Sequence, residues 1–184
     1  MEYKCLNNKN FQFNEFSLKS IRVEDIESIR KWRNAQLDVL RQDKIITYEE
    51  QIKYFNDHIL PEKIKNEPRN ILFSFFRNDV LIGYGGLVHI SWKDLRAEIS
   101  FLLNPNYLSE VDYPLFFSSY LTLIKSIAFD DLKFNRLFTE TFNIRQFHIS
   151  ILESNGFIKE GILKDHVIIN GKHVDSIIHG CLNK

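Results

Sequence analysis

Apolar residues at helical spacing predict two helices in the first third of the chain. Within residues 24–34 they recur every three or four positions behind two acidic residues, which predicts a helix over that segment. Thr47 and Glu50 have the spacing of a capping box, so a second helix begins at Thr47 and ends before Pro61. Weak alternation of apolar and polar residues over Ser17–Arg22 indicates a strand before the first helix.

Alternating apolar and polar positions predict three consecutive strands in the middle of the chain. The strands are Asn70–Arg77, Val80–Trp92 and Arg96–Leu103. Their short connections, Asn78-Asp79 and Lys93-Asp94, are typical of tight turns. The three strands are therefore expected to form an antiparallel meander.

The last third of the chain has the pattern of a helix, a strand, a second helix and a hairpin. The first helix is mostly apolar and spans Pro114–Leu132, and the strand Arg136–Phe142 follows it. The second helix ends at Gly156, a residue type suited to a C-terminal cap. Asn170-Gly171 is the strongest turn signal in the chain, and it joins strands over residues 157–169 and 172–182.

This order of elements predicts one α/β domain with a mixed, mostly antiparallel sheet of about six to seven strands, flanked by about four helices. A chain of 184 residues is long enough for one domain, which we assign to residues 17–184. Residues 1–16 then form either an N-terminal extension or an extra strand. The order lacks the repeated strand–helix units of a doubly wound nucleotide-binding fold.

The composition and charge of the chain argue against several classes of function. The 24 basic residues balance 24 acidic residues, which argues against a nucleic-acid-binding protein, since such a protein needs a basic surplus. No apolar run is long enough for a signal-peptide core or a membrane helix, which predicts a cytoplasmic protein that does not bind membranes. Two cysteines and six scattered histidines give no metal-ligand spacing, so we expect no metal ion.

Several short motifs, each weak alone, carry the main functional signal. In chain order they are Trp32-Arg33-Asn34, Thr139-Glu140-Thr141-Phe142-Asn143, Leu152-Glu153-Ser154-Asn155-Gly156-Phe157, Glu160-Gly161, Asn170-Gly171 and Asp175. Together with the order of elements, they make the chain resemble the GNAT superfamily of acetyl-CoA-dependent N-acetyltransferases. The branch that it resembles includes the ribosomal-protein and amino-sugar N-acetyltransferases, and the resemblance covers residues 17–182.

The resemblance implies that acetyl-CoA is the co-substrate and binds where the strand Arg96–Leu103 splays from its neighbour. Backbone N–H groups at this point would hold the pantetheine arm and polarise the thioester carbonyl. The implied cofactor-binding residues are Leu102, Leu103, Asn104, Leu108, Asn143 and Arg145. The last two are both included because the family's asparagine position falls on Arg145, two residues after Asn143.

The loop Tyr107–Pro114 contains no glycine, although the family places a glycine-rich phosphate-binding turn there. It carries Glu110 and Asp112, and carboxylates near a pyrophosphate repel it unless they point away. The resemblance therefore implies an atypical phosphate site, with either weaker CoA binding or anchoring by side chains.

Two residues are candidates for catalysis. Glu98 lies on the splayed strand, on the face opposite Phe101, and a carboxylate there can remove a proton from the amine as a general base. The alternative is a surface pair with Arg96. His148 lies on the inward face of the last helix, where it can contact the cofactor, protonate the thiolate or be a hydrogen-bonded core histidine. The family's tyrosine acid falls on Leu152, so that role is vacant or moved.

The acceptor of the acetyl group is expected to be a primary amine of a small molecule. Arg33 and Arg41 can pair with a phosphate and Trp32 can stack on a base, which suits a nucleotide-linked amino sugar. The predicted acceptor-binding residues are Trp32, Arg33, Asn34, Arg41, Tyr84, His89 and Asp175. A protein N-terminus is the alternative acceptor, and a degenerate domain that binds acyl-CoA without turnover is the alternative class. The sequence fits a monomer or a homodimer.

Overall fold

One sheet of eight strands runs through the computed structural model, which describes residues 1–184. The strands are β1 Phe11–Phe13, β2 Phe16–Ser20, β3 Ile71–Arg77, β4 Val80–Ser91, β5 Arg96–Leu103, β6 Arg136–Phe142, β7 Ile158–Ile169 and β8 Lys172–Leu182. Their order across the sheet is β1-β2-β3-β4-β5-β6-β8-β7, and only β5 and β6 pair in parallel. The prediction of one α/β domain with a mostly antiparallel sheet is confirmed. The sheet exceeds the expected six to seven strands because the segment before residue 17 supplies β1.

Four α-helices flank the sheet. They are α1 Ile26–Asn34, α2 Tyr48–Tyr54, α3 Asp112–Lys125 and α4 Gln146–Ser154. The predicted capping box begins α2: the Thr47 hydroxyl accepts from the Glu50 N–H, and the Glu50 carboxylate accepts from the Thr47 N–H. α2 continues through wider and then tighter helical turns to Ile64, and α3 continues through wider turns alone to Asp131.

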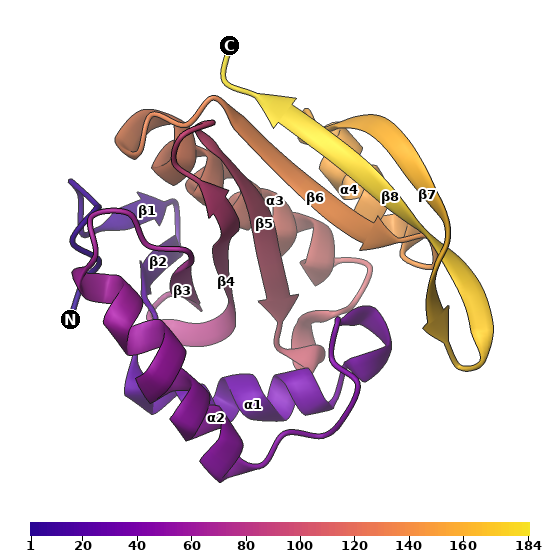
Figure 1. Ribbon diagram of the computed structural model, residues 1–184, viewed down its shortest axis with the longest axis horizontal. Coiled ribbons are helices and arrows are strands. Elements are labelled where there is room, and N and C mark those ends of the chain that lie inside the picture. Colours follow the sequence, from indigo (N-terminus) through magenta and orange to yellow (C-terminus); the bar gives the residue numbers. More distant parts are fainter.

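The helices divide between the two faces of the sheet (Figure 1). α3 and α4 cover one face, where 27 buried residues form the main core around Phe116, Tyr120 and Leu152. α1 and α2 cover the other face over a smaller cluster of eight buried residues, which includes Ile29 and Leu102. Successive side chains of a strand point to opposite faces, so β5 contributes to both clusters.

The N-terminal segment packs against the domain. Tyr3 and Leu6 belong to the main core. The backbone N–H groups of Asn7 and Asn8 donate to the carboxylate of Asp131, at 2.9 and 3.1 Å. Residues 1–16 therefore contribute a strand and buried side chains to the same domain as the rest of the chain.

The divergence of β5 from β6 creates the space in which a site can form. The two strands pair only where Arg96–Glu98 lies beside Arg136–Phe138. Beyond this point Ile99–Leu103 and Thr139–Phe142 do not pair, and Figure 1 shows the strands separating toward the loop that follows α1. Backbone groups of β5 that point into the gap therefore lack a strand partner.

β7 and β8 form a long hairpin at one edge of the sheet (Figure 1). Its turn has Asn170 at φ 50° and Gly171 at φ 75°, the left-handed conformations that an Asn-Gly turn favours. Among the helices of the chain, none combines the length and the apolar content that crossing a bilayer requires.

Candidate active site

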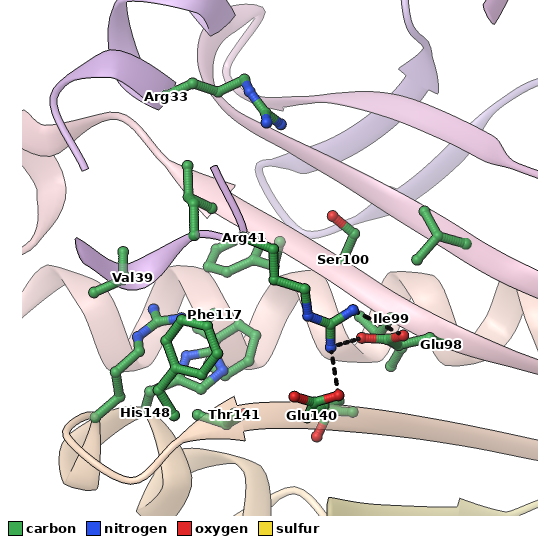
Figure 2. Close-up of a pocket in the computed structure, with 16 residues that line it drawn as sticks. Arg33, Val39, Arg41, Glu98, Ile99, Ser100, Phe117, Glu140, Thr141 and His148 are labelled. Carbon is green, nitrogen blue, oxygen red and sulfur yellow. Dashed lines mark hydrogen bonds and ion pairs between the residues drawn. The ribbon is translucent and has the colours of Figure 1, made fainter. Parts of the chain in front are cut away.

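A cavity of about 200 Å³ occupies the gap between β5 and β6, and we call it the β5–β6 cleft. The two strands supply facing walls, β5 through residues 98–101 and β6 through residues 139–142. Phe117 of α3 and His148 of α4 line it from the helices behind, and Arg41 enters it from the loop after α1 (Figure 2). Segments that are far apart in the sequence therefore meet in one space.

A single guanidinium spans the cleft. Arg41 Nη2 donates to Glu98 Oε1 at 2.8 Å and lies 3.0 Å from Glu140 Oε2, as Figure 2 shows. Glu98 comes from β5 and Glu140 from β6, and their side chains are only 10% and 17% exposed. Two carboxylates can stay this close in a nearly buried place because a cation lies between them.

A bulge in β4 brings His89 to the other side of Glu98. The pairing of β4 with β5 shifts between Val88 and Ser91, and His89 there adopts φ 48°. His89 Nδ1 consequently lies 2.7 Å from Glu98 Oε2. The His89 side chain is 65% exposed, so it connects a nearly buried carboxylate with solvent.

Hydrogen bonds of the Asn34 side chain hold the loop that carries Arg41. Its side-chain amide donates to the Ile46 carbonyl at 2.8 Å, and its Oδ1 accepts from the Ile46 N–H at 3.0 Å and from Gln42 Nε2 at 3.0 Å. Gln42 also accepts from Arg33 Nε at 2.8 Å. The backbone next to Arg41 is thus held in place, while the guanidinium sits at the end of a long and 44% exposed side chain.

A chain of three side chains fixes the state of His148. Arg145 Nη2 donates to the Tyr113 hydroxyl at 3.0 Å, and that hydroxyl lies 2.7 Å from His148 Nδ1. Burial, with the nearby Arg145 charge, lowers the pKa of His148 well below its usual value. The ring is therefore neutral and accepts the Tyr113 proton at Nδ1, which leaves its own N–H at Nε2. A neutral imidazole can donate a hydrogen bond into the cleft but is a poor proton donor.

A second cavity, of about 420 Å³, lies between the α1 and α2 layer and the sheet. Most of its lining is apolar, and we call it the apolar cavity. It shares Arg33, Val88 and Ser100 with the β5–β6 cleft, so the two spaces adjoin. Arg33 Nη1 donates to the Tyr84 hydroxyl at 2.6 Å near this junction.

Comparison with known protein families identifies the family of this chain. The family described as "Acetyltransferase (GNAT) domain" matches residues 18–178, which is most of the chain. The chain belongs to the GNAT acetyltransferase family. It is accordingly an acetyl-CoA-dependent N-acetyltransferase, as the sequence predicted.

Solved GNAT structures share its fold. A spermidine N-acetyltransferase from Vibrio cholerae in complex with CoA and spermine has a TM-score of 0.79 and 18% sequence identity, over 92% of this chain and 96% of that chain. A dodecameric spermidine N-acetyltransferase from Vibrio cholerae in an intermediate state has a TM-score of 0.76 and 18% identity, over 92% and 95%. No curated protein matches the sequence.

The β5–β6 cleft has polar groups that suit the pantetheine arm of a GNAT co-substrate. Thr139 Oγ1 lines this cleft, is buried and has no hydrogen-bond partner within the protein. Unpaired backbone groups of β5 face the same gap, and His148 adds an N–H donor. Buried polar atoms without partners are costly, so these groups are suited to the amide and carbonyl groups of a thioester co-substrate.

The loop before α3 differs from a glycine-rich phosphate turn. The Ser109 hydroxyl accepts from the Asp112 N–H at 3.0 Å and donates to the Asp112 carboxylate at 2.8 Å. Glu110 is exposed beside them, and Leu108 is 42% exposed. One of the N–H groups that begin α3 is therefore already used, and two carboxylates lie nearby.

The structure brings together part of the predicted site. Arg33, Arg41, Glu98, Arg145 and His148 line the β5–β6 cleft. His89 joins this set through Glu98, and Tyr84 lines the apolar cavity.

The other predicted cofactor residues have structural partners of their own. Leu102 packs in the cluster under α1, and Leu103 packs in the main core, where its carbonyl accepts from Gln36. Asn104 accepts the Asn106 N–H at 3.1 Å within the turn that follows β5. The Asn104 N–H also donates to the Ile82 carbonyl at 2.8 Å, and none of these three residues lines the β5–β6 cleft.

Three further predicted residues lie outside both cavities. Lys164 Nζ (2.8 Å) and the Asp165 N–H (3.0 Å) bind Asp175 within the β7–β8 hairpin. The Asn143 side chain accepts from Gln146 at 2.8 Å, so of the pair Asn143 and Arg145 only Arg145 lines the cleft. Trp32 packs against the cluster under α1.

Two contributors were missed from the sequence. Glu140 belongs to the motif Thr139–Asn143, and the alternation of side chains along a splayed strand is the signal that points to it. Tyr113 contacts His148 only because α3 packs against α4, which neither segment encodes alone. No group of three or more His, Cys, Asp or Glu side chains is arranged to hold a metal ion.

Proposed function

We propose that the protein acetylates the primary amine of a small cationic acceptor, and that the acceptor's ammonium group binds between Glu98 and Glu140. The observation that carries this proposal is the shared guanidinium: two carboxylates on separate strands already hold one positive charge. An ammonium group has the same charge and donates hydrogen bonds to the same oxygens. The acceptor would therefore take the place of the Arg41 guanidinium, which would turn toward solvent.

Glu98 is the proposed general base. Amine attack requires a neutral amine, so a proton must leave the ammonium group before or during attack. Glu98 lies on the face of β5 that borders both cavities, and His89 contacts its second oxygen at 2.7 Å. Glu98 would receive the proton, and the exposed His89 ring would connect the carboxylate to solvent.

The cleft supplies the groups that hold the acetyl donor. Acetyl-CoA supplies an acetyl group activated as a thioester. The new C–N bond replaces the thioester C–S bond, and the released CoA thiol carries the second proton of the amine. Unpaired backbone N–H groups of β5 and the Nε2–H of His148 are preorganised donors for a carbonyl oxygen that gains negative charge. The Thr139 hydroxyl would bind the pantetheine arm along the opposite wall.

A cationic acceptor is better supported than the nucleotide-linked amino sugar expected from the sequence. The Arg41 guanidinium binds two carboxylates, and the Arg33 guanidinium binds Gln42 and Tyr84. Neither guanidinium is therefore free to bind a phosphate. The similar Vibrio cholerae enzymes are named for spermidine, which is a cationic amine. A cation site formed by Glu98 and Glu140 agrees with an acceptor of this charge.

The experiment is a measurement of thiol release from acetyl-CoA with a panel of acceptors. The panel contains ethylamine, 2-phenylethylamine, spermidine, a nucleotide-linked amino sugar and a peptide with a free N-terminus. We expect release with one or more of the simple cationic amines, inhibition by high salt, and loss of release in Glu98→Gln. Release only with the amino sugar or the peptide would contradict the cationic-acceptor proposal, and acetyl-CoA binding without release from any amine would indicate a non-catalytic domain.

A further inference from the structure

The β5–β6 cleft continues into the apolar cavity beneath α1 and α2. Val88 and Ser100 line both spaces, and Val88 lies beside Glu98 in the pairing of β4 with β5. The apolar cavity consequently opens next to the carboxylate that we propose as the base. Its volume of about 420 Å³ falls within the range of small-molecule sites, about 300–1,000 Å³.

The walls of the apolar cavity are hydrophobic and fixed. Ile26 and Ile29 come from α1, Phe55 and Ile59 from the helical segment that continues α2, and Leu72 from β3. Each of these side chains is less than 10% exposed and belongs to the same packed cluster. A space with such walls gains free energy when an apolar group fills it, because apolar surface then leaves water.

The charged groups at the edge of this cavity do not suit an additional ammonium group. Arg33 and Lys44 are both cationic. Glu50 is the one carboxylate in the lining, and Lys44 Nζ at 2.9 Å and the Thr47 N–H at 2.8 Å already bind it. A second ammonium group placed here would be buried without a free anionic partner and would face two cations.

We infer that the apolar cavity holds an apolar body of the acceptor, so that the preferred substrate is a monoamine with an aliphatic or aromatic group and not a polyamine. The inference rests on the proposed function, because it takes the amine itself to lie between Glu98 and Glu140. The polar head and the apolar body of such a molecule then match two adjoining spaces of opposite character. The cleft recognises the charge, and the cavity selects the substituent.

A substrate series tests the inference directly. Thiol release from saturating acetyl-CoA is measured with ethylamine, propylamine, butylamine and hexylamine, and with 2-phenylethylamine and spermidine. We expect kcat/KM to rise about fourfold for each methylene that enters the apolar cavity, the fold-change that burial of one methylene predicts. We also expect 2-phenylethylamine to exceed spermidine by at least about tenfold, because a second charge cannot be buried.

A matched pair of variants assigns the effect to the apolar cavity. Ile46 lines it from a loop, so Ile46→Phe fills part of the space with little risk to the fold. Ile45 is its neighbour, is 66% exposed and lines neither cavity, so Ile45→Phe is the control. We expect Ile46→Phe to lower kcat/KM for hexylamine about tenfold and to leave ethylamine within about twofold, whereas Ile45→Phe changes neither.

The outcomes separate this inference from the proposed function. Equal rates along the alkylamine series, or a preference for spermidine, would overturn the inference and leave amine acetylation intact. If Ile46→Phe changes the preference among acetyl-, butyryl- and hexanoyl-CoA but not among amines, the cavity holds the acyl chain and the inference is wrong. If no amine releases thiol, the proposed function fails and the inference fails with it.

Discussion

Glu98, the last residue of β5 that pairs with β6, and Glu140, two residues beyond the last paired residue of β6, both bind the guanidinium of Arg41, at 2.8 and 3.0 Å. The arrangement follows from topology. β5 and β6 are the parallel pair of the sheet, and they stop pairing just after Glu98. The side chains beyond that point face a gap that a ligand can enter. Arg41 reaches the same gap from a loop that is held by hydrogen bonds to Asn34.

Removal of the Arg41 side-chain charge should strengthen acceptor binding. In Arg41→Gln the acceptor's ammonium group no longer competes with an internal cation for Glu98 and Glu140. We expect KM for the amine to fall about fivefold, which is the scale of a partly exposed charge pair, with kcat unchanged or higher. Lys31→Gln, which removes an exposed cation of α1 outside both cavities, is the control and should leave KM unchanged. An increase of KM in Arg41→Gln would mean that Arg41 binds the acceptor directly.

Acid should destabilise the protein through His148. Burial lowers the pKa of His148 in the folded chain, whereas in the unfolded chain it is about 6.5. Below that pH the unfolded state binds a proton that the folded state does not, so the free energy of unfolding falls as pH decreases. One such group contributes up to about 1.4 kcal/mol per pH unit.

Urea unfolding at a series of pH values between 7 and 5 measures this dependence. His148→Gln keeps a hydrogen-bond partner for Tyr113 but cannot bind the proton. We expect the variant to have a shallower pH dependence than the wild type over this range. Parallel curves for the two proteins would show that His148 does not control the acid sensitivity.

The phosphates of CoA should contribute little to its binding. The Ser109 hydroxyl already occupies an N–H at the start of α3, and Glu110 and Asp112 place negative charge there. Isothermal titration with CoA and with pantetheine at low salt compares the two contributions. We expect the dissociation constants to differ by less than about tenfold, because these carboxylates repel the phosphates and exposed ion pairs elsewhere contribute only about 1 kcal/mol or less. A difference above a hundredfold would reveal a strong phosphate site that the loop does not suggest.

The sequence predicted most of the fold because its local signals agree with one another. The capping box at Thr47, the alternation along β5 and the turn at Asn170-Gly171 each depend on neighbouring residues, and each is present. Glu98 lines the β5–β6 cleft, and its face could be predicted from strand alternation and its place from the family resemblance. Such features can be predicted without knowing how distant segments of the chain pack together.

The parts of the site that were missed depend on long-range packing. Whether Arg41 meets a phosphate or a carboxylate is decided by the path of a loop that lies 57 residues before Glu98 in the sequence. Asp175 has the right residue type and strand alternation for an acceptor site, but Lys164, on the other strand of the β7–β8 hairpin, is its partner. The apolar cavity arises from the spacing of α1 and α2 above the sheet, which no single segment encodes.

In the proposed reaction Glu98 removes the proton from the acceptor, and Glu140 only helps to bind it. Steady-state acetyl transfer by Glu98→Gln and Glu140→Gln, followed from pH 6 to 9, tests this claim most directly. We expect Glu98→Gln to lower kcat by about 10² to 10⁴-fold, the range for loss of a general base, and Glu140→Gln to raise KM with kcat nearly unchanged. A Glu98→Gln variant with full kcat across this pH range would contradict the claim.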